Sequence, residues 1–180
     1  IKQLTAYAAE LGIRVIPLQQ SLGHVNYILR HPAYAGLREE EKYCDQWCPL
    51  QPASLQLFKD ILEELLELHD SPQYIHIGGD ETRRLGTCDQ CAAIAKKEGK
   101  GKLYTDYCNK VVEYIVSLGA TPILWDDMMR QWPVSDLKHL APKTDLMAWA
   151  YGADPFARLT PEILDRYAEA GIPVWGAGAF

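Results

Sequence analysis

Apolar residues recur along this chain in two patterns, one with helical spacing and one as short continuous runs. The helical pattern is clearest from Ser54 to His69, and it returns from Leu103 to Leu118. The remaining apolar residues gather in short runs, the composition of strands buried on both faces of a parallel sheet. We therefore expect strands at 13–18, 74–79, 121–126, 145–150 and 172–177.

A glycine separates a helical segment from the apolar run that follows it at three places. Gly12, Gly119 and Gly171 fit the left-handed residue that lies just past a helix C-terminus. Thr160 and Pro161 are typical of a helix start, as N-cap and first helical residue. Alternating helices and strands predict an α/β fold, either a doubly wound sheet or part of a (β/α)8 barrel. A complete barrel has roughly 250 residues, more than the 180 found here.

Two adjacent carboxylates follow the second predicted strand directly. The apolar run 74–77 is interrupted by Gly78 and Gly79, and Asp80 and Glu81 come next. Neighbouring side chains on a strand point to opposite faces, but the glycines permit a turn that leaves both acids at the strand end. That end is where α/β proteins bind ligands. The alternative is an ordinary strand exit with solvated acids.

Aromatic and polar residues also follow the other predicted strands. Tryptophan lies at the end of three of them, and core packing is the simple explanation for any one of these. Several tryptophans at equivalent places favour a pocket, because aromatic rings suit the apolar face of a sugar while carboxylates suit its hydroxyls. The candidates are His24, Trp125, Asp126, Trp149, Tyr151 and Trp175.

Charge excludes several classes of partner. The chain has 24 acidic and 18 basic residues, a net charge of −6, and no cluster of Lys or Arg. This balance argues against a nucleic acid or an anionic membrane as partner. No apolar run approaches the roughly 20 residues of a membrane-spanning helix. A signal peptide is not visible, although the chain opens inside a helical pattern at Ile1.

Five cysteines permit more than one reading. Cys44 and Cys48, and again Cys88 and Cys91, have spacings compatible with a structural zinc site. Alternatively, Cys88 and Cys91 simply begin a helix and all these thiols are free, and we place Cys108 on a buried helix face. We expect free thiols with no metal or cofactor, and keep zinc as the alternative. The lack of a disulfide framework favours a reducing compartment, hence a cytoplasmic location.

Taken together, these residues resemble the catalytic barrel of family 20 glycoside hydrolases, the β-N-acetylhexosaminidases. The string His76-Ile77-Gly78-Gly79-Asp80-Glu81 is specific, and the segment from Ile13 to His24 supports it. Five further motifs look closest to the hexosaminidase D branch: Gly23-His24, Leu29-Arg30-His31-Pro32, Leu37-Arg38-Glu39, Trp47-Cys48-Pro49-Leu50 and Trp125-Asp126-Asp127-Met128. The resemblance implies that residues 1–180 form a single, incomplete TIM-barrel catalytic domain containing strands three to seven.

The resemblance also implies a chemistry. Such an enzyme is a retaining β-N-acetylhexosaminidase that removes terminal N-acetylglucosamine or N-acetylgalactosamine from a glycan or glycoconjugate by substrate-assisted catalysis. The 2-acetamido oxygen of the substrate attacks the anomeric carbon and forms an oxazolinium intermediate. Glu81 would act as general acid and then as general base. Asp80 would orient the acetamido N–H and offset its developing positive charge.

Less specific roles follow for the other candidates. The resemblance places His24 beside the active site and gives the tryptophans the pocket wall. Tyr151 would donate to the acetamido oxygen, and Asp126 would accept from sugar hydroxyls. We expect His76 to be a buried, hydrogen-bonded histidine that supports the acids, and Asp127 to face solvent.

One expected part of the family pattern is missing. The family binds sugar hydroxyls with an arginine at the end of its first barrel strand, and no such strand precedes Ile1. We therefore expect a fragment of a longer protein whose isolated 180 residues are inactive and self-associate, as a homo-oligomer or an aggregate. Two rival functions remain: a non-catalytic sugar-binding fragment, and a divalent-metal TIM-barrel lyase or aldolase with ligands among His24, His76, Asp80, Glu81 and Asp126.

Overall fold

A parallel four-stranded sheet forms the centre of the protein. The computed structural model describes residues 1–140, 143–152 and 154–178. The strands lie in the order in which they occur in the chain, without a reversal. Sequential order is the winding of a barrel, whereas a doubly wound sheet reverses direction part-way. The strands are β1 (Tyr74–His76), β2 (Thr121–Trp125), β3 (Asp145–Trp149) and β4 (Val174–Ala177).

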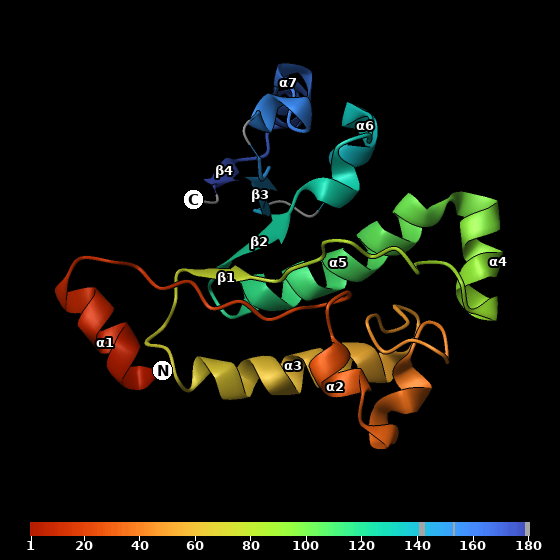
Figure 1. Ribbon diagram of the computed structural model, residues 1–180, viewed down its shortest axis with the longest axis horizontal. Helices are drawn as coiled ribbons and strands as arrows, with labels where there is room; N and C mark the ends of the chain where they lie inside the picture. Colours follow the sequence, from red (N-terminus) through yellow and green to blue (C-terminus); the bar gives the residue numbers. More distant parts are fainter. Residues whose placement is uncertain (141–142, 153, 179–180) are drawn as a thin grey trace.

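Helices connect and cover these strands (Figure 1). The two long helices α3 and α5 lie side by side next to β1, and Tyr114 of α5 donates a hydrogen bond to Glu63 of α3 at 2.7 Å. The α-helices are α1 (Lys2–Glu10), α2 (Asn26–Leu29), α3 (Pro52–Leu66), α4 (Asp89–Glu98), α5 (Lys100–Ser117), α6 (Val134–Leu137) and α7 (Pro161–Ala170). The short 3₁₀ helices among the described residues are η1 (Pro32–Leu37), η2 (Asp127–Met129) and η3 (Pro155–Ala157).

The predicted helix ends are confirmed. Gly12, Gly119 and Gly171 have φ angles of +70°, +82° and +75°, the left-handed conformation expected after a helix. Thr160 is the N-cap of α7 and Pro161 its first residue. Both long helices begin two or three residues before the predicted position, because Pro52 starts α3 and Lys100 starts α5.

The two faces of the sheet have different surroundings. Ile75, Leu124 and Leu146 alternate onto one face and are buried with α5 in the hydrophobic core. The opposite face carries the polar and aromatic residues of the strands. In the strand register this face holds Tyr74, His76, Ile123, Trp125, Asp145, Met147, Trp149 and Trp175.

The prediction of a strand at 13–18 is wrong in extent. Only Leu18 forms a bridge, to His76, although the hydrogen bonds around it are parallel-strand bonds: His76 N–H donates to Pro17 O and Gln19 N–H donates to His76 O, both at 2.9 Å. Pro17 has no N–H to donate and Ile13 is 58% exposed, so pairing is limited to the end of the segment. The chain direction is as expected for a neighbouring strand of β1.

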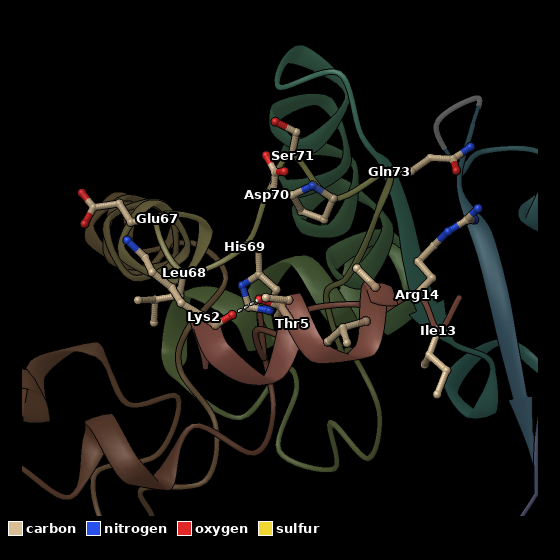
Figure 2. A pocket seen from close by; sticks show the side chains of 14 residues that line it. Lys2, Thr5, Ile13, Arg14, Glu67, Leu68, His69, Asp70, Ser71 and Gln73 are labelled. Atoms are coloured by element: carbon tan, nitrogen blue, oxygen red, sulfur yellow. Dashed lines mark hydrogen bonds between the residues drawn. The ribbon is translucent and has the colours of Figure 1, made fainter. Parts of the chain in front are cut away.

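A cavity of about 640 Å³ lies at the end of the sheet where the strands begin. Figure 2 shows Lys2 and Thr5 of α1 and His69 and Gln73 of the loop after α3 among its lining. Next to it, α1 exposes Leu4 and Tyr7, and its two capping residues Ile1 and Leu11 are exposed as well. Within the described ranges, no helix has both the length and the apolar character needed to cross a membrane.

Candidate active site

Two consecutive glycines end β1 and set the path of the chain into the site. Gly78 and Gly79 have φ angles of +67° and +89°, so the strand ends at His76 rather than at the predicted residue 79. A Cβ atom on Gly78 would lie 1.8 Å from Oε1 of Gln20, and one on Gly79 would lie 2.6 Å from the hydroxyl of Tyr104. That hydroxyl donates to Gly79 O at 2.8 Å. Only glycine fits this turn between the loop after Leu18 and helix α5.

The turn brings both predicted acids to one imidazole. His24 Nε2 lies 3.0 Å from Asp80 Oδ2 and 3.6 Å from Glu81 Oε2. Glu81 and His24 both have positive φ angles, +47° and +54°, which non-glycine residues rarely adopt. Strained backbone of this kind persists where surrounding structure enforces it, and it is frequent at functional sites. Glu81 also accepts a hydrogen bond from the exposed Arg83 at 2.7 Å.

Asp127 belongs to this acid cluster and does not simply face solvent, contrary to expectation. Its Oδ2 accepts the backbone N–H of Glu81 at 3.0 Å, and its Oδ1 lies 3.5 Å from the indole nitrogen of Trp149. Burial raises the pKa of the Asp127 carboxyl, and the nearby charge of Asp80 adds to this effect. Asp127 was missed as a site residue because it lies in η2, beyond the end of β2, where strand alternation does not indicate where a side chain points.

The prediction that Asp126 accepts from sugar hydroxyls is wrong. Asp126 is fully buried, and both of its carboxylate oxygens are held by Arg130, at 2.7 and 2.8 Å. The hydroxyl of Tyr167 on α7 lies 3.3 Å from Oδ2. The physical reason is alternation at the end of β2, since Trp125 points to the polar face and the next residue therefore points to the helices. The i,i+4 spacing of Asp126 and Arg130 was the available signal for this ion pair.

Three of the predicted aromatic residues lie in two separate contacts, one around Trp149 and one around Trp125. Trp149 contacts Tyr151, with ring centroids 5.1 Å apart, and Tyr151 is 55% exposed. Trp125 lies with its ring centroid 4.3 Å from that of His76.

The prediction that Trp175 forms part of the pocket wall is wrong, because its side chain does not reach the acid cluster. Its indole nitrogen donates to Asp145 at 2.8 Å and its ring meets the edge of Tyr74 at 5.0 Å. Asp145 and Tyr74 are the first residues of their strands. The expectation assumed that Trp175 ended its strand, whereas β4 continues two residues beyond it to Ala177.

His76 is buried behind the acids, with a hydrogen bond of the kind expected. Its Nδ1 accepts the N–H of Gly78 at 3.0 Å. Burial lowers the pKa of His76 to about 4, so the ring is neutral at neutral pH. In the part of the chain that the structure describes, its Nε2 has no hydrogen-bond partner.

The residues proposed as ligands for a divalent-metal lyase or aldolase do not come together as a metal site. Among the described residues, the acids and histidines of this site do not form a group of three or more ligand atoms within 4.8 Å of one another. One group that does lies elsewhere and consists of Glu39, Cys48, Cys88 and Cys91. The zinc alternative kept in the sequence analysis had Cys44 in place of Glu39, but the Cys44 sulfur contacts Asn26 at 3.8 Å instead.

Comparison with known proteins assigns the chain to a protein family. The model of glycosyl hydrolase family 20, catalytic domain, matches residues 1–165. The chain belongs to this family. It is 29% identical to bovine (Bos taurus) hexosaminidase D and 31% identical to human (Homo sapiens) hexosaminidase D, in both cases over its whole length. It spans 54% of the bovine protein and 38% of the human one.

Solved family 20 structures agree in fold. The β-N-acetylhexosaminidase of Bacteroides fragilis superimposes on 96% of this chain with a TM-score of 0.76 and 22% identity, and the chain covers 34% of that protein. Dispersin B superimposes on 96% of this chain with a TM-score of 0.66 and 21% identity, and the chain covers 50% of it. The sequential parallel strands therefore form part of the family 20 (β/α)8 barrel.

Proposed function

We propose that the protein is a retaining β-N-acetylhexosaminidase that cleaves terminal N-acetylglucosamine or N-acetylgalactosamine from glycans or glycoconjugates by substrate-assisted catalysis. The observation that carries this proposal is the convergence of Asp80 and Glu81 on His24 at the carboxyl end of β1. Two carboxylates with different surroundings are what the reaction needs, one to move a proton and one to hold a charge. Residues 1–180 would belong to one catalytic domain.

Asp80 has the surroundings of a charge-holding group. Its side chain is mostly buried, and Oδ2 is held by His24. Oδ1 is buried and accepts from none of the described residues. An unpaired buried acceptor costs about 1–3 kcal/mol, which a ligand N–H would recover. The acetamido N–H of a bound sugar is such a donor, and Asp80 would then stabilise the positive charge of the oxazolinium.

Glu81 has the surroundings of a proton-transfer group. Its side chain is 36% exposed, so water and a leaving-group oxygen can both reach it. Its backbone N–H is held by Asp127 and its Oε1 by Arg83, which fixes the carboxyl near the turn. In the first step Glu81 gives its proton to the glycosidic oxygen. In the second it takes a proton from the water that opens the oxazolinium, which restores the starting state.

The aromatic residues at the same end supply a surface for the sugar. The Trp149 indole contacts Asp127, which accepts a hydrogen bond from the backbone of Glu81. The ring of Tyr151 packs on the ring of Trp149 and is largely exposed. Indole and phenol rings suit the apolar face of a hexose or an acetamido methyl. We include Trp125 and Tyr151 in this surface, with Tyr151 as a donor to the acetamido oxygen.

Replacing Glu81→Gln in the protein at its full encoded length tests this assignment. Hydrolysis of an aryl N-acetyl-β-glucosaminide should fall by about 10²–10⁴-fold, because glutamine keeps the shape but carries no transferable proton. Glu113→Gln on the exposed face of α5 is the matched control and should keep wild-type turnover. The aryl β-glucoside, which lacks the acetamido nucleophile, should not be cleaved by either protein. Unchanged turnover by the Glu81 variant would refute the assignment, and binding of an N-acetylglucosamine thiazoline without turnover by the wild type would favour a sugar-binding protein.

A further inference from the structure

A buried cluster of three thiols and one carboxylate lies where two loops meet, outside the acid cluster. Cys48 Sγ is 3.7 Å from Cys88 Sγ and 3.5 Å from Cys91 Sγ. A carboxylate oxygen of Glu39 completes a group whose ligand atoms all lie within 4.8 Å of one another. Glu39 and Cys48 are each 2% exposed and Cys91 is 0% exposed.

We propose that Glu39, Cys48, Cys88 and Cys91 bind a structural zinc ion. Zinc in structural sites is tetrahedral, with Zn–S bonds of about 2.3 Å, so two sulfurs on one ion stand about 3.8 Å apart. The two sulfur separations given above are close to that value. A disulfide would require about 2.05 Å between the sulfur atoms, and these cysteines are free.

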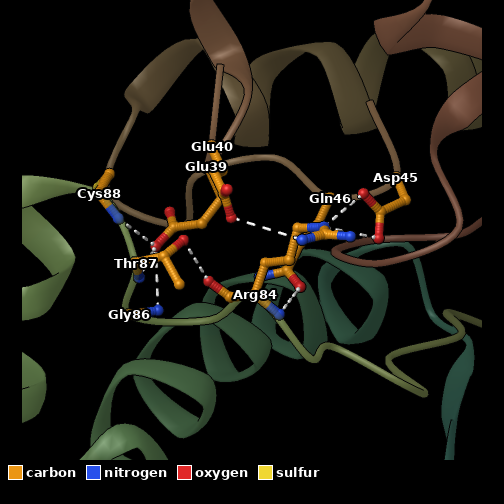
Figure 3. A network of polar contacts seen from close by, with 8 residues as sticks. All are labelled: Glu39, Glu40, Asp45, Gln46, Arg84, Gly86, Thr87 and Cys88. Atoms are coloured by element: carbon orange, nitrogen blue, oxygen red, sulfur yellow. Dashed lines mark hydrogen bonds and ion pairs between the residues drawn. The ribbon is translucent and has the colours of Figure 1, made fainter. Parts of the chain in front are cut away.

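The carboxylate of Glu39 is an independent indication of a cation. Figure 3 shows its Oε1 accepting three consecutive backbone N–H groups, from Gly86, Thr87 and Cys88, at 2.9, 2.8 and 3.2 Å. Its Oε2 is buried, and no described residue donates to it. Burying a carboxylate is costly unless its charge is paired. Because the ligand atoms of three cysteines surround this group, a metal cation is the partner that fits.

The local backbone favours thiolates at the cluster. Cys88 is the N-cap of α4 and Cys91 lies in its first turn, where the helix dipole stabilises negative charge. The N–H of Cys91 donates to Cys88 Sγ at 3.4 Å. Zinc binds cysteine as the thiolate, so each thiol gives up a proton to water when it binds the ion and zinc binding releases protons overall.

Hydrogen bonds hold the two loops together and position the ligands in advance. In the first loop, Glu39 N–H donates to Gln46 O at 3.0 Å and Cys48 N–H donates to Leu37 O at 2.7 Å. Arg84 of the second loop donates to Asp45 at 2.8 Å (Figure 3). Four protein ligands leave no open position for a substrate, so the site is structural rather than catalytic. The ion would fasten the loop that follows His24 to the loop that follows Glu81.

Zinc is the preferred metal for this ligand set. Three thiolates are soft ligands that select zinc over magnesium, calcium and manganese, and a carboxylate is an accepted fourth zinc ligand. The site does not depend on the proposed hydrolase activity, and its readout is the metal itself.

Metal content and Co²⁺ substitution test the proposal. The protein is purified at its full encoded length without a polyhistidine tag, with its thiols reduced, and zinc is measured by mass spectrometry. We expect about one zinc ion per chain. Replacement by Co²⁺ should give the intense visible bands and sulfur-to-metal charge-transfer band of tetrahedral cobalt thiolate. These measurements use the wild type and require no variant to fold.

Variants then assign the ligands. Cys48→Ser, Cys88→Ser and Cys91→Ser should each lose the cobalt charge-transfer intensity of one thiolate and weaken zinc binding. Glu39→Gln keeps an acceptor for the three N–H groups but loses the charge, and it should weaken zinc binding by about tenfold or more. Cys44→Ser is the matched control in the same loop and should keep the wild-type metal content and spectrum.

Several outcomes would overturn the proposal. They are a reduced wild-type protein that holds no zinc and gives no cobalt thiolate spectrum, and a Cys44→Ser variant that loses metal as fully as Cys88→Ser. Mass-spectrometric detection of a Cys48–Cys91 or Cys48–Cys88 disulfide in the native protein would also overturn it.

Discussion

The polar face of the sheet carries a tryptophan–aspartate contact at each end, and the two differ in their surroundings. At the carboxyl end, Trp149 lies 3.5 Å from Asp127, which also holds the backbone of Glu81. At the amino end, Trp175 donates to Asp145 at 2.8 Å and packs on Tyr74. The residue types are the same at both ends.

The difference separates a candidate site from a structural contact. Both tryptophan rings pack on a tyrosine ring, but the amino-end hydrogen bond is short, an arrangement that stabilises a fold. The carboxyl-end contact is long and joins a cluster with strained backbone at His24 and Glu81 and a buried, unpaired oxygen on Asp80. Residue type alone therefore does not identify a ligand site. Unmet hydrogen-bonding capacity and strained backbone do so better.

The largest expected effect comes from removing one carboxylate charge at the carboxyl end of the sheet, compared with the same change at the amino end. Asp80→Asn should lower the turnover of an aryl N-acetyl-β-glucosaminide by about 10²–10³-fold, because a neutral amide cannot offset the charge of the oxazolinium. Asp145→Asn is the matched change at the amino end. It keeps an oxygen that accepts from Trp175, so turnover should stay near wild type. Steady-state kinetics on both variants decide the point, and equal losses at the two ends would contradict the comparison.

The next effect concerns stability against pH at the carboxyl end of β1. Burial lowers the pKa of His76 from about 6.5 to about 4. Between these two pH values the imidazole is protonated in the unfolded chain but neutral in the folded protein. Stability from this group is complete above about pH 6.5 and is lost as the pH falls towards 4, by up to about 3 kcal/mol.

Urea unfolding of His76→Gln between pH 7 and pH 4 measures this contribution. The difference in unfolding free energy between wild type and variant should shrink as the pH falls. His139→Gln, at an exposed position, should follow the wild-type curve at a constant offset. A His76 variant that also parallels the wild type would show that folding does not change the pKa of this imidazole.

Local sequence signals predicted the long helices α3 and α5, the start of α7 and the parallel sheet. The glycines past the helix ends and the Thr160–Pro161 start encode backbone conformations directly, so their prediction needed no tertiary information. The segment 13–18 shows the limit of this approach, since its pairing depends on neighbours along the sheet edge.

Site residues were predictable where the strand pattern fixes them and not where register decides. The Gly78–Gly79 turn indicated where both acids would lie. The burial of Asp126 follows from alternation past Trp125, whereas the contact between Asp127 and Glu81 depends on the turn into η2, which strand spacing does not encode. The position of Trp175 depends on how far β4 extends, and the membership of Glu39 in the thiol cluster depends on a contact between two loops. Spacing within either segment carries no signal for such contacts.

The smallest expected effects come from the two tryptophans themselves, and they should fall on different quantities. Trp175→Phe removes the donor to a buried carboxylate, so it should lower the free energy of unfolding by about 1–3 kcal/mol and leave kcat/KM near wild type. Trp149→Phe removes a long, weak contact, so stability should change by less than about 1 kcal/mol. Under the proposed function, its kcat/KM for the aryl N-acetyl-β-glucosaminide should fall by about tenfold, because the indole would form part of the sugar surface and orient Asp127. Urea unfolding and steady-state kinetics on the same two preparations give all four values. If Trp175→Phe impairs catalysis while Trp149→Phe impairs only stability, the functional end of this sheet face is the opposite one.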